Sequence, residues 1–112
     1  MTQLLVRPAA AADIEEAYLW YEKQRAGLGE EFLAAVDSLL GEIVAHPTTY
    51  PMIHREARRA LVRRFPYAVF FRVYGETVVV LACMHARTAR SHPLEDPYLK
   101  GGLQLRPAAA LC

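Results

Sequence analysis

The chain has 112 residues, 54% of them hydrophobic, and its formal net charge at pH 7 is +1. This length and composition predict one globular domain with its own core, and they exclude a disordered chain. The charge is divided unevenly, because residues 1–51 have three basic and eight acidic side chains whereas residues 52–112 have ten basic and four acidic ones. This division has two interpretations: two solvated faces of opposite sign, or a second half that meets an anionic partner.

The expected location follows from the apolar segments and the cysteines. The first residues have too short an apolar stretch for a signal peptide, and the longest apolar run, Val78 to Met84, is too short to cross a bilayer. Cys83 lies in that run, and its separation from Cys112 matches no metal or redox spacing, so a buried thiol is expected. We predict a cytoplasmic protein with no membrane segment, no metal and no cofactor.

The first elements are a short strand and a helical hairpin. Gln3 to Arg7 is an apolar strand that Pro8 ends. Asp13 has the position of a helix N-cap, with Glu16 three residues later as in a capping box. The helix that it begins should end near Arg25, because glycines follow at two nearby positions. A second helix is expected from about Glu30 to Ala45, and the short break between the two makes them antiparallel neighbours.

Beyond the second helix the hydrophobic period changes to two, which predicts strands. They are expected at about Arg58–Arg64, Tyr67–Val73 and Thr77–Arg87, after a loop at 47–51. The order β-α-α-β-β-β predicts an α+β fold, in which an antiparallel helical hairpin packs on one face of a mostly antiparallel sheet. Residues 1–98 should form this domain, and the Gly-, Ala- and Pro-rich stretch 99–112 should be a flexible C-terminal tail.

The strand register predicts which side chains share a face. A two-residue turn at Tyr74-Gly75 would place Phe71 opposite Val78 and Val69 opposite Val80, as an apolar set under the helices. A second turn at Phe65-Pro66 would align the preceding strand in the same way. The face away from the helices would then have an apolar strip surrounded by basic side chains. The strip is Leu61, Phe70, Val79 and Leu81, and the basic residues are Arg59, Arg63, Arg72, His85 and Arg87.

This surface is of the kind that binds a partner, since large apolar patches are rare on free monomers and guanidinium groups suit planar anions. The other interpretation is that the tail or a second copy covers the strip and the arginines only solvate its edge. If the strip faces outward, Leu81→Asp should abolish binding and leave the fold intact.

Several segments resemble the RelE/ParE family of toxins. They are Ala26-Gly27-Leu28-Gly29-Glu30-Glu31-Phe32-Leu33, Arg63-Arg64-Phe65-Pro66-Tyr67 with Phe70-Phe71-Arg72-Val73, and Val79-Val80-Leu81-Ala82 leading to His85-Ala86-Arg87. The order and spacing of these segments carry the resemblance, which covers about residues 3–92. The resemblance implies the toxin of a type II toxin–antitoxin system, associated with plasmid stabilization and growth inhibition. It also implies an amphipathic, acidic antitoxin through which alone the toxin would reach operator DNA.

The family divides by target, and both branches stay open. RelE-like members cleave messenger RNA in the ribosome, and here His85, Arg63 and Arg87 would be the catalytic candidates, with Tyr98 as a late aromatic group. ParE-like members inhibit DNA gyrase and are not known as nucleases. The second half has only one lysine, Lys100, in the tail, so the basic face lacks an amine to act as a general base.

The last two strands also look more like the ParE branch. We therefore favour a ParE-like gyrase inhibitor, with a RelE-like endonuclease or an inactive member that only binds antitoxin as alternatives. The residues expected to contact target or antitoxin are Arg59, Leu61, Arg63, Phe70, Arg72, Leu81, His85, Arg87 and Arg90.

Overall fold

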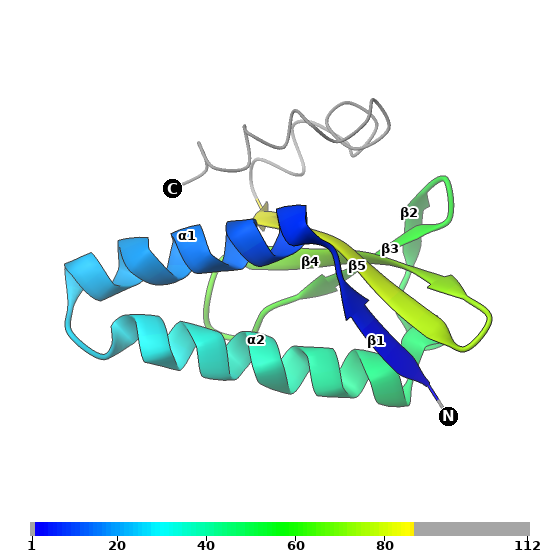
Figure 1. Cartoon of the computed structure of the whole chain (residues 1–112), viewed down its shortest axis with the longest axis horizontal. Coiled ribbons are helices and arrows are strands. Elements are labelled where there is room, and N and C mark those ends of the chain that lie inside the picture. Colours follow the sequence, from blue (N-terminus) through cyan, green and yellow to red (C-terminus); the bar gives the residue numbers. More distant parts are fainter. Residues whose placement is uncertain (1, 87–112) are drawn as a thin grey trace.

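The computed structural model describes residues 2–86 as two helices packed on one face of a five-stranded sheet (Figure 1). This confirms the predicted α+β class. The strand order is β1-β5-β4-β3-β2, in which β1 is parallel to β5 and the other neighbours are antiparallel. No helix among these residues is long and apolar enough to cross a membrane. The elements are β1 (Gln3–Val6), α1 (Pro8–Gln24), α2 (Leu28–Ala45), the 3-10 turn η1 (Pro47–Thr49), β2 (Met52–His54), β3 (Ala57–Leu61), β4 (Tyr67–Tyr74) and β5 (Thr77–His85).

The first helix begins earlier than the sequence predicted. Pro8 occupies the first turn of α1, where its fixed φ suits a helix and its missing N–H would have had no partner. Asp13 is therefore an interior residue of the helix, and the prediction that it is an N-cap was wrong. Its side chain is only 4% exposed, and its Oδ2 accepts a hydrogen bond of 3.0 Å from the backbone N–H of Cys83. Asp13 thus ties α1 to strand β5.

The turn between the helices depends on one glutamate and two glycines. Glu22 accepts hydrogen bonds of 2.8 Å from the backbone N–H groups of Gly27 and Gly29. Gly27 has a φ of +92°, which glycine adopts without steric cost. Gly29 lies against α1 so closely that a Cβ there would come within 2.7 Å of the carbonyl oxygen of Tyr18. The glycines predicted to interrupt the helices therefore also allow them to approach each other.

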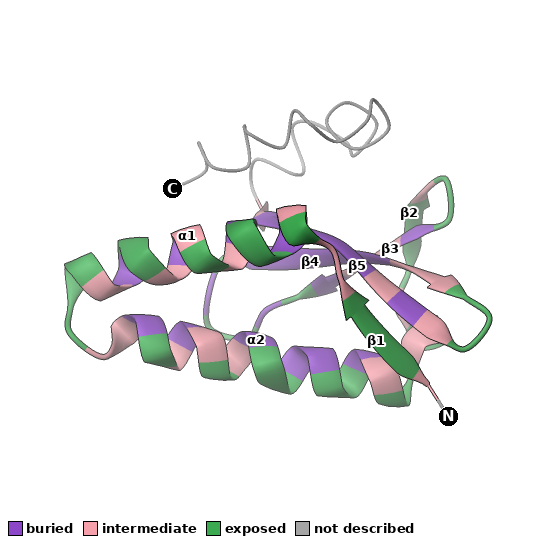
Figure 2. Ribbon diagram, in the orientation of Figure 1, coloured by how far each residue is buried: buried purple, intermediate pink, exposed green. Residues whose placement is uncertain are grey.

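The main core fills the space between the helices and the sheet (Figure 2). The aromatic rings of Tyr21 and Phe32 contact those of Phe65 and Tyr67, with centroids 5.0 to 6.1 Å apart. Such edge-to-face contacts add to the free energy gained by burying the rings. The alternate residues of β4 and β5 that were predicted to lie under the helices include Phe71, Val78 and Val80, and all three are in this core.

Both hairpin registers differ from the prediction by two residues. Tyr74 pairs with Thr77, so the turn is Gly75-Glu76 and not Tyr74-Gly75. Leu61 pairs with Ala68, because β3 ends at Leu61 and the chain reaches β4 through a five-residue loop, not through a tight Phe65-Pro66 turn. Since side chains alternate with a period of two, a shift by two leaves each residue on its predicted face.

A β-bulge in β5 does reverse part of the prediction. Phe71 pairs with Val80 but Phe70 pairs with Ala82, so Leu81 is an extra residue in the strand. Beyond it, every side chain of β5 lies on the face opposite to the one predicted. Cys83 is therefore in the main core, and Ala82 is on the other face. This bulge could not be predicted from the sequence, because the run from Val78 to Met84 is apolar throughout and its side chains could lie on either face of the sheet.

Strand β2 was not predicted. The structure places the three residues Met52–His54 at the edge of the sheet, joined to β3 by a turn in which Arg55 and Glu56 have φ values of 48° and 66°. Neither residue commonly adopts a positive φ, so no local pattern of residues indicates a hairpin at this position.

Candidate partner-binding surface

The sheet face away from the helices, called the outer face below, has its own apolar cluster. All its members come from β3, β4 and β5, and both helices bury their side chains in the main core instead. Phe70 and Leu81 were correctly placed on this face, but they are only 1% and 5% exposed and offer no surface to a partner as they stand. The cluster is Ala57, Ala68, Phe70, Leu81, Ala82 and Met84, with Val79 packed against it.

Around this cluster lie exposed apolar and basic side chains at the end of the sheet that holds β2. Leu61 is 58% exposed and Tyr74 is 53% exposed. Arg59 pairs with Phe70 and Arg72 pairs with Val79, so both guanidinium groups belong to the outer face, as predicted. We call this the β2–β4 surface, and it consists of Ile53, His54, Arg59, Leu61, Arg72 and Tyr74. Met52 pairs with Arg58, which in turn pairs with the core residue Phe71, so Met52 lies on the helix-facing side of the sheet.

His85 does not belong to this surface. Because it follows the bulge, it pairs with Tyr67 and lies on the helix-facing side, with the two ring centroids 5.4 Å apart. The prediction that His85 stands beside Arg59 and Arg72 was therefore wrong. Within residues 2–86, the His85 imidazole is therefore not placed to act on the same phosphate as the guanidinium groups of Arg59 and Arg72.

Arg63 is likewise not in a strand, because β3 ends two residues before it. It lies in the loop before β4 and lines an open groove of about 400 Å³ between this loop and α2, together with Leu61 and Arg64. Two other predicted residues, Arg87 and Arg90, and the late aromatic Tyr98 lie outside the described residues. Within residues 2–86, no three His, Cys, Asp or Glu side chains are grouped so that they could hold a metal ion.

The groove is also lined by the carboxylate of Glu31, in the first turn of α2, which lies among positively charged arginines. Its carboxylate accepts a hydrogen bond of 3.0 Å from Arg64 Nη2 and another of 3.4 Å from Arg25 Nη2. The hydrogen bond from Arg64 holds the pKa of Glu31 below its ordinary value of 4.5. This anion also lies where the helix dipole favours it.

The lowered pKa of Glu31 predicts a small, pH-dependent effect on stability. A carboxyl whose pKa is lower in the folded state stabilises the fold when it is ionised, and this contribution is lost as the pH falls through the folded-state pKa. Glu31→Gln should therefore lower the urea midpoint slightly at pH 7 and not at pH 3, and the exposure of the group keeps the effect small. Urea unfolding at both pH values tests this. An equal loss at pH 3 would mean that the ion pair is not the cause.

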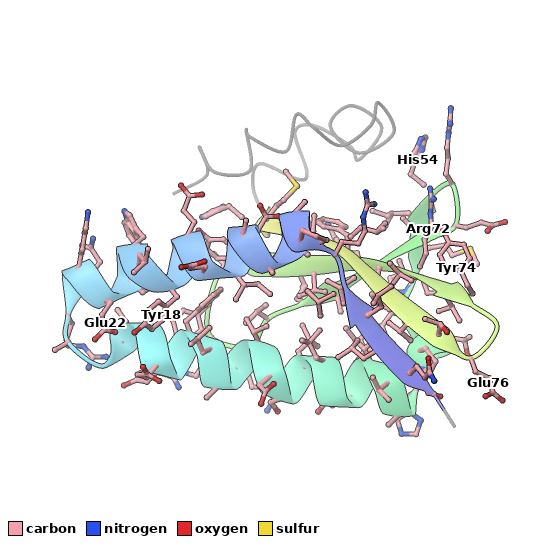
Figure 3. All side chains as sticks on the ribbon, viewed as in Figure 1. Tyr18, Glu22, His54, Arg72, Tyr74 and Glu76 are labelled. Atoms are coloured by element: carbon pink, nitrogen blue, oxygen red, sulfur yellow. The ribbon has the colours of Figure 1, made fainter. Side chains whose placement is uncertain are left out.

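The sequence did not identify three members of the β2–β4 surface, Ile53, His54 and Tyr74. His54 was expected to face solvent in a loop, and Tyr74 was expected to be a turn residue. His54 instead pairs with Ala57 at the sheet edge, and Tyr74 accepts a hydrogen bond of 3.4 Å from Arg72 Nη1 (Figure 3). For Tyr74 the one signal was its alternation with Arg72 on the same face of a strand, and no local signal marked Ile53 or His54.

The described residues thus form a small α+β protein with an apolar and cationic surface on its sheet. Residues 4–90 match the family model described as the ParE toxin of the type II toxin–antitoxin system parDE. The chain therefore belongs to the ParE toxin family, and it is a ParE-type toxin with an antitoxin implied as its partner.

A solved structure supports this assignment. The chain resembles one titled as the chromosomal ParDE toxin–antitoxin system from P. aeruginosa, with 25% sequence identity and a TM-score of 0.59. The alignment covers 74% of this chain and 94% of that one. No curated protein sequence matches the chain.

Proposed function

We propose that this ParE-type toxin inhibits DNA gyrase and that a cognate antitoxin neutralises it by covering the β2–β4 surface. The observation that carries the proposal is the chemistry of this surface. It combines exposed apolar side chains with guanidinium groups, which suits recognition of a folded protein. In the cell the toxin would act in the cytoplasm, where its target and its antitoxin are found.

Cleavage of messenger RNA is the weaker candidate. General acid–base catalysis needs a group that can donate or accept a proton near the reacting phosphate. His85, the candidate for this role, lies on the helix-facing side of the sheet, away from Arg59 and Arg72. Lys23, on α1, is the only lysine among the described residues. The arginines of the outer face bind anions but hardly deprotonate.

The experiment that tests the proposal compares gyrase activity with messenger RNA integrity. Purified chain should inhibit supercoiling by gyrase in vitro, and its expression in cells should stop growth and induce the DNA-damage response while transcripts stay intact. Rapid ribosome-dependent cleavage of transcripts with normal supercoiling would instead establish the nuclease. Normal growth at high expression, with antitoxin binding retained, would establish an inactive binding protein.

A matched pair of variants tests whether the β2–β4 surface is the neutralised one. Leu61→Asp places a carboxylate on this surface, and Leu19→Asp makes the same change on α1 at a similar exposure of 51%. Leu61 is a better choice than Leu81, which is buried and would destabilise the fold if charged. Leu61→Asp should weaken antitoxin binding by at least about fivefold, since losing an important apolar contact costs more than 1 kcal/mol. Calorimetric titration with the purified antitoxin measures this, and equal affinities for the two variants would place the interface elsewhere.

A further inference from the structure

The C-terminal end of β3 has an edge that no other strand covers within residues 2–86. Strand β2 pairs with β3 at Ala57 and Arg58, whereas β3 continues to Leu61. Beyond β2 the sheet therefore ends at β3 itself, where Leu61 is 58% exposed. Proteins usually protect such an edge, because its N–H and C=O groups can pair with another strand.

The backbone of Leu61 offers a donor and an acceptor to this edge. The N–H of Val62 donates to the carbonyl of Tyr67 in β4 at 2.8 Å, whereas the N–H of Arg59 donates away from β4, to the carbonyl of Pro51 at 3.1 Å. Backbone groups alternate between the two sides of a strand, so those of Leu61 point to the same side as those of Arg59. Pro51 has no N–H to donate, which leaves the carbonyl of Arg59 as a second acceptor on this side.

This edge borders the groove of about 400 Å³ between β3 and α2. On α2 the groove is lined by the short side chains of Ala34, Ala35 and Ser38, which leave space beside Leu61. Ser38 and Glu42 also line a second open hollow, of about 580 Å³, that reaches the end of the helix. Together the two follow α2 for ~22 Å, long enough for an extended segment of about six residues.

The charges in the groove favour an acidic partner over a second copy of this chain. Arg64 has an ion pair of 3.0 Å with Glu31, and the other carboxylate of the groove, Glu42, lies about three helical turns away. Arg63 is exposed and has no ion pair or hydrogen bond among residues 2–86. Two copies paired through this edge would bring like charges together, whereas a carboxylate would pair with the Arg63 guanidinium group.

We infer that an extended segment of a partner protein pairs with β3 at Leu61 as an added strand and places an Asp or Glu carboxylate on Arg63. A strand supplies the donor and the acceptor that the backbone of Leu61 needs, which a nucleic acid does not. Side chains on one face of that strand would lie over Ala34 and Ala35, so small apolar residues suit them. The inference goes beyond the proposed function, because it concerns the edge of the sheet and holds whatever the toxin inhibits.

Nuclear magnetic resonance titrations of the purified chain with three blocked heptapeptides test this inference. The first peptide alternates valine and threonine around a central glutamate, the second has glutamine at the centre, and the third is the glutamate peptide with its three central amides N-methylated. With nine tenths of the chain bound, the glutamate peptide should slow hydrogen exchange of the Leu61 amide about tenfold. It should bind about threefold more tightly than the glutamine peptide, and the N-methylated peptide should not bind.

Variants separate the shape of the groove from its charge. Ala34→Phe fills the groove without a change of charge, so it should weaken binding of the glutamate peptide at least tenfold. Ala12→Phe makes the same change at an exposed position of α1 and should leave the affinity unchanged. Arg63→Gln should remove the preference for glutamate over glutamine while the Leu61 amide is still protected. Backbone spectra of each variant verify that the fold is intact.

Three results would overturn the added strand: no binding of the glutamate peptide, binding without protection of the Leu61 amide, or full affinity of either the N-methylated peptide or the Ala34→Phe variant. Equal affinity of the glutamate and glutamine peptides would overturn the contact with Arg63. Because these titrations involve neither gyrase nor antitoxin, their failure is distinguishable from failure of the proposed function.

Discussion

Gly29→Ala should destabilise the fold by about 2 kcal/mol, because it forces a methyl group into a space that α1 already occupies. The new Cβ would lie 2.6 Å from Glu22 Oε1 and 2.7 Å from both the backbone oxygen and a ring carbon of Tyr18. Either the helices separate, or Glu22 gives up its hydrogen bonds to the turn. For a domain of this size the midpoint of thermal unfolding should fall by roughly 10 °C.

The matched control for this prediction is Gly41→Ala, in the same helix. A Cβ at Gly41 would meet nothing within 4 Å, and the residue is exposed in the interior of α2. Alanine there should stabilise the protein by about 0.5–1 kcal/mol, since glycine loses more conformational freedom in a helix. Thermal unfolding followed by circular dichroism measures both variants. If they shift the midpoint in the same direction, the close approach of the helices at Gly29 is not limiting.

Asp13→Ala should also destabilise the fold by about 2 kcal/mol or more, since it leaves the buried N–H of Cys83 without this acceptor. Asp13 is the one charged residue among the buried side chains of residues 2–86, and it joins α1 to β5 just after the bulge at Leu81. Asp13→Asn keeps a side-chain oxygen and should lose less. Urea unfolding gives the free energies, and amide hydrogen exchange at Cys83 should speed up most in the alanine variant.

Asp37→Ala provides the control for the loss of an aspartate from a helix. Asp37 is exposed on α2, so its removal should change the free energy of unfolding by no more than about 0.5 kcal/mol. Equal stability of the Asp13→Ala and Asp37→Ala variants would show that the contact between α1 and β5 contributes nothing measurable.

The sequence by itself determined the class of the fold and most of its faces. The change of hydrophobic period from 3.6 to 2 near residue 50 gave the order of helices and strands, and the resemblance of the segments gave the toxin family. Arg59 and Arg72 were placed on the outer face although both hairpin registers were off by two residues. The alternation of side chains along a strand survives such a shift, so the predicted faces did not depend on the exact turns.

Only the tertiary structure decided two features of the candidate site. The bulge at Leu81 turned His85 toward the helices, and an apolar run with no polar residue to mark its faces could not reveal it. Strand β2 forms through a turn whose residues have unfavourable φ angles, so pairing with β3 and not local preference creates it.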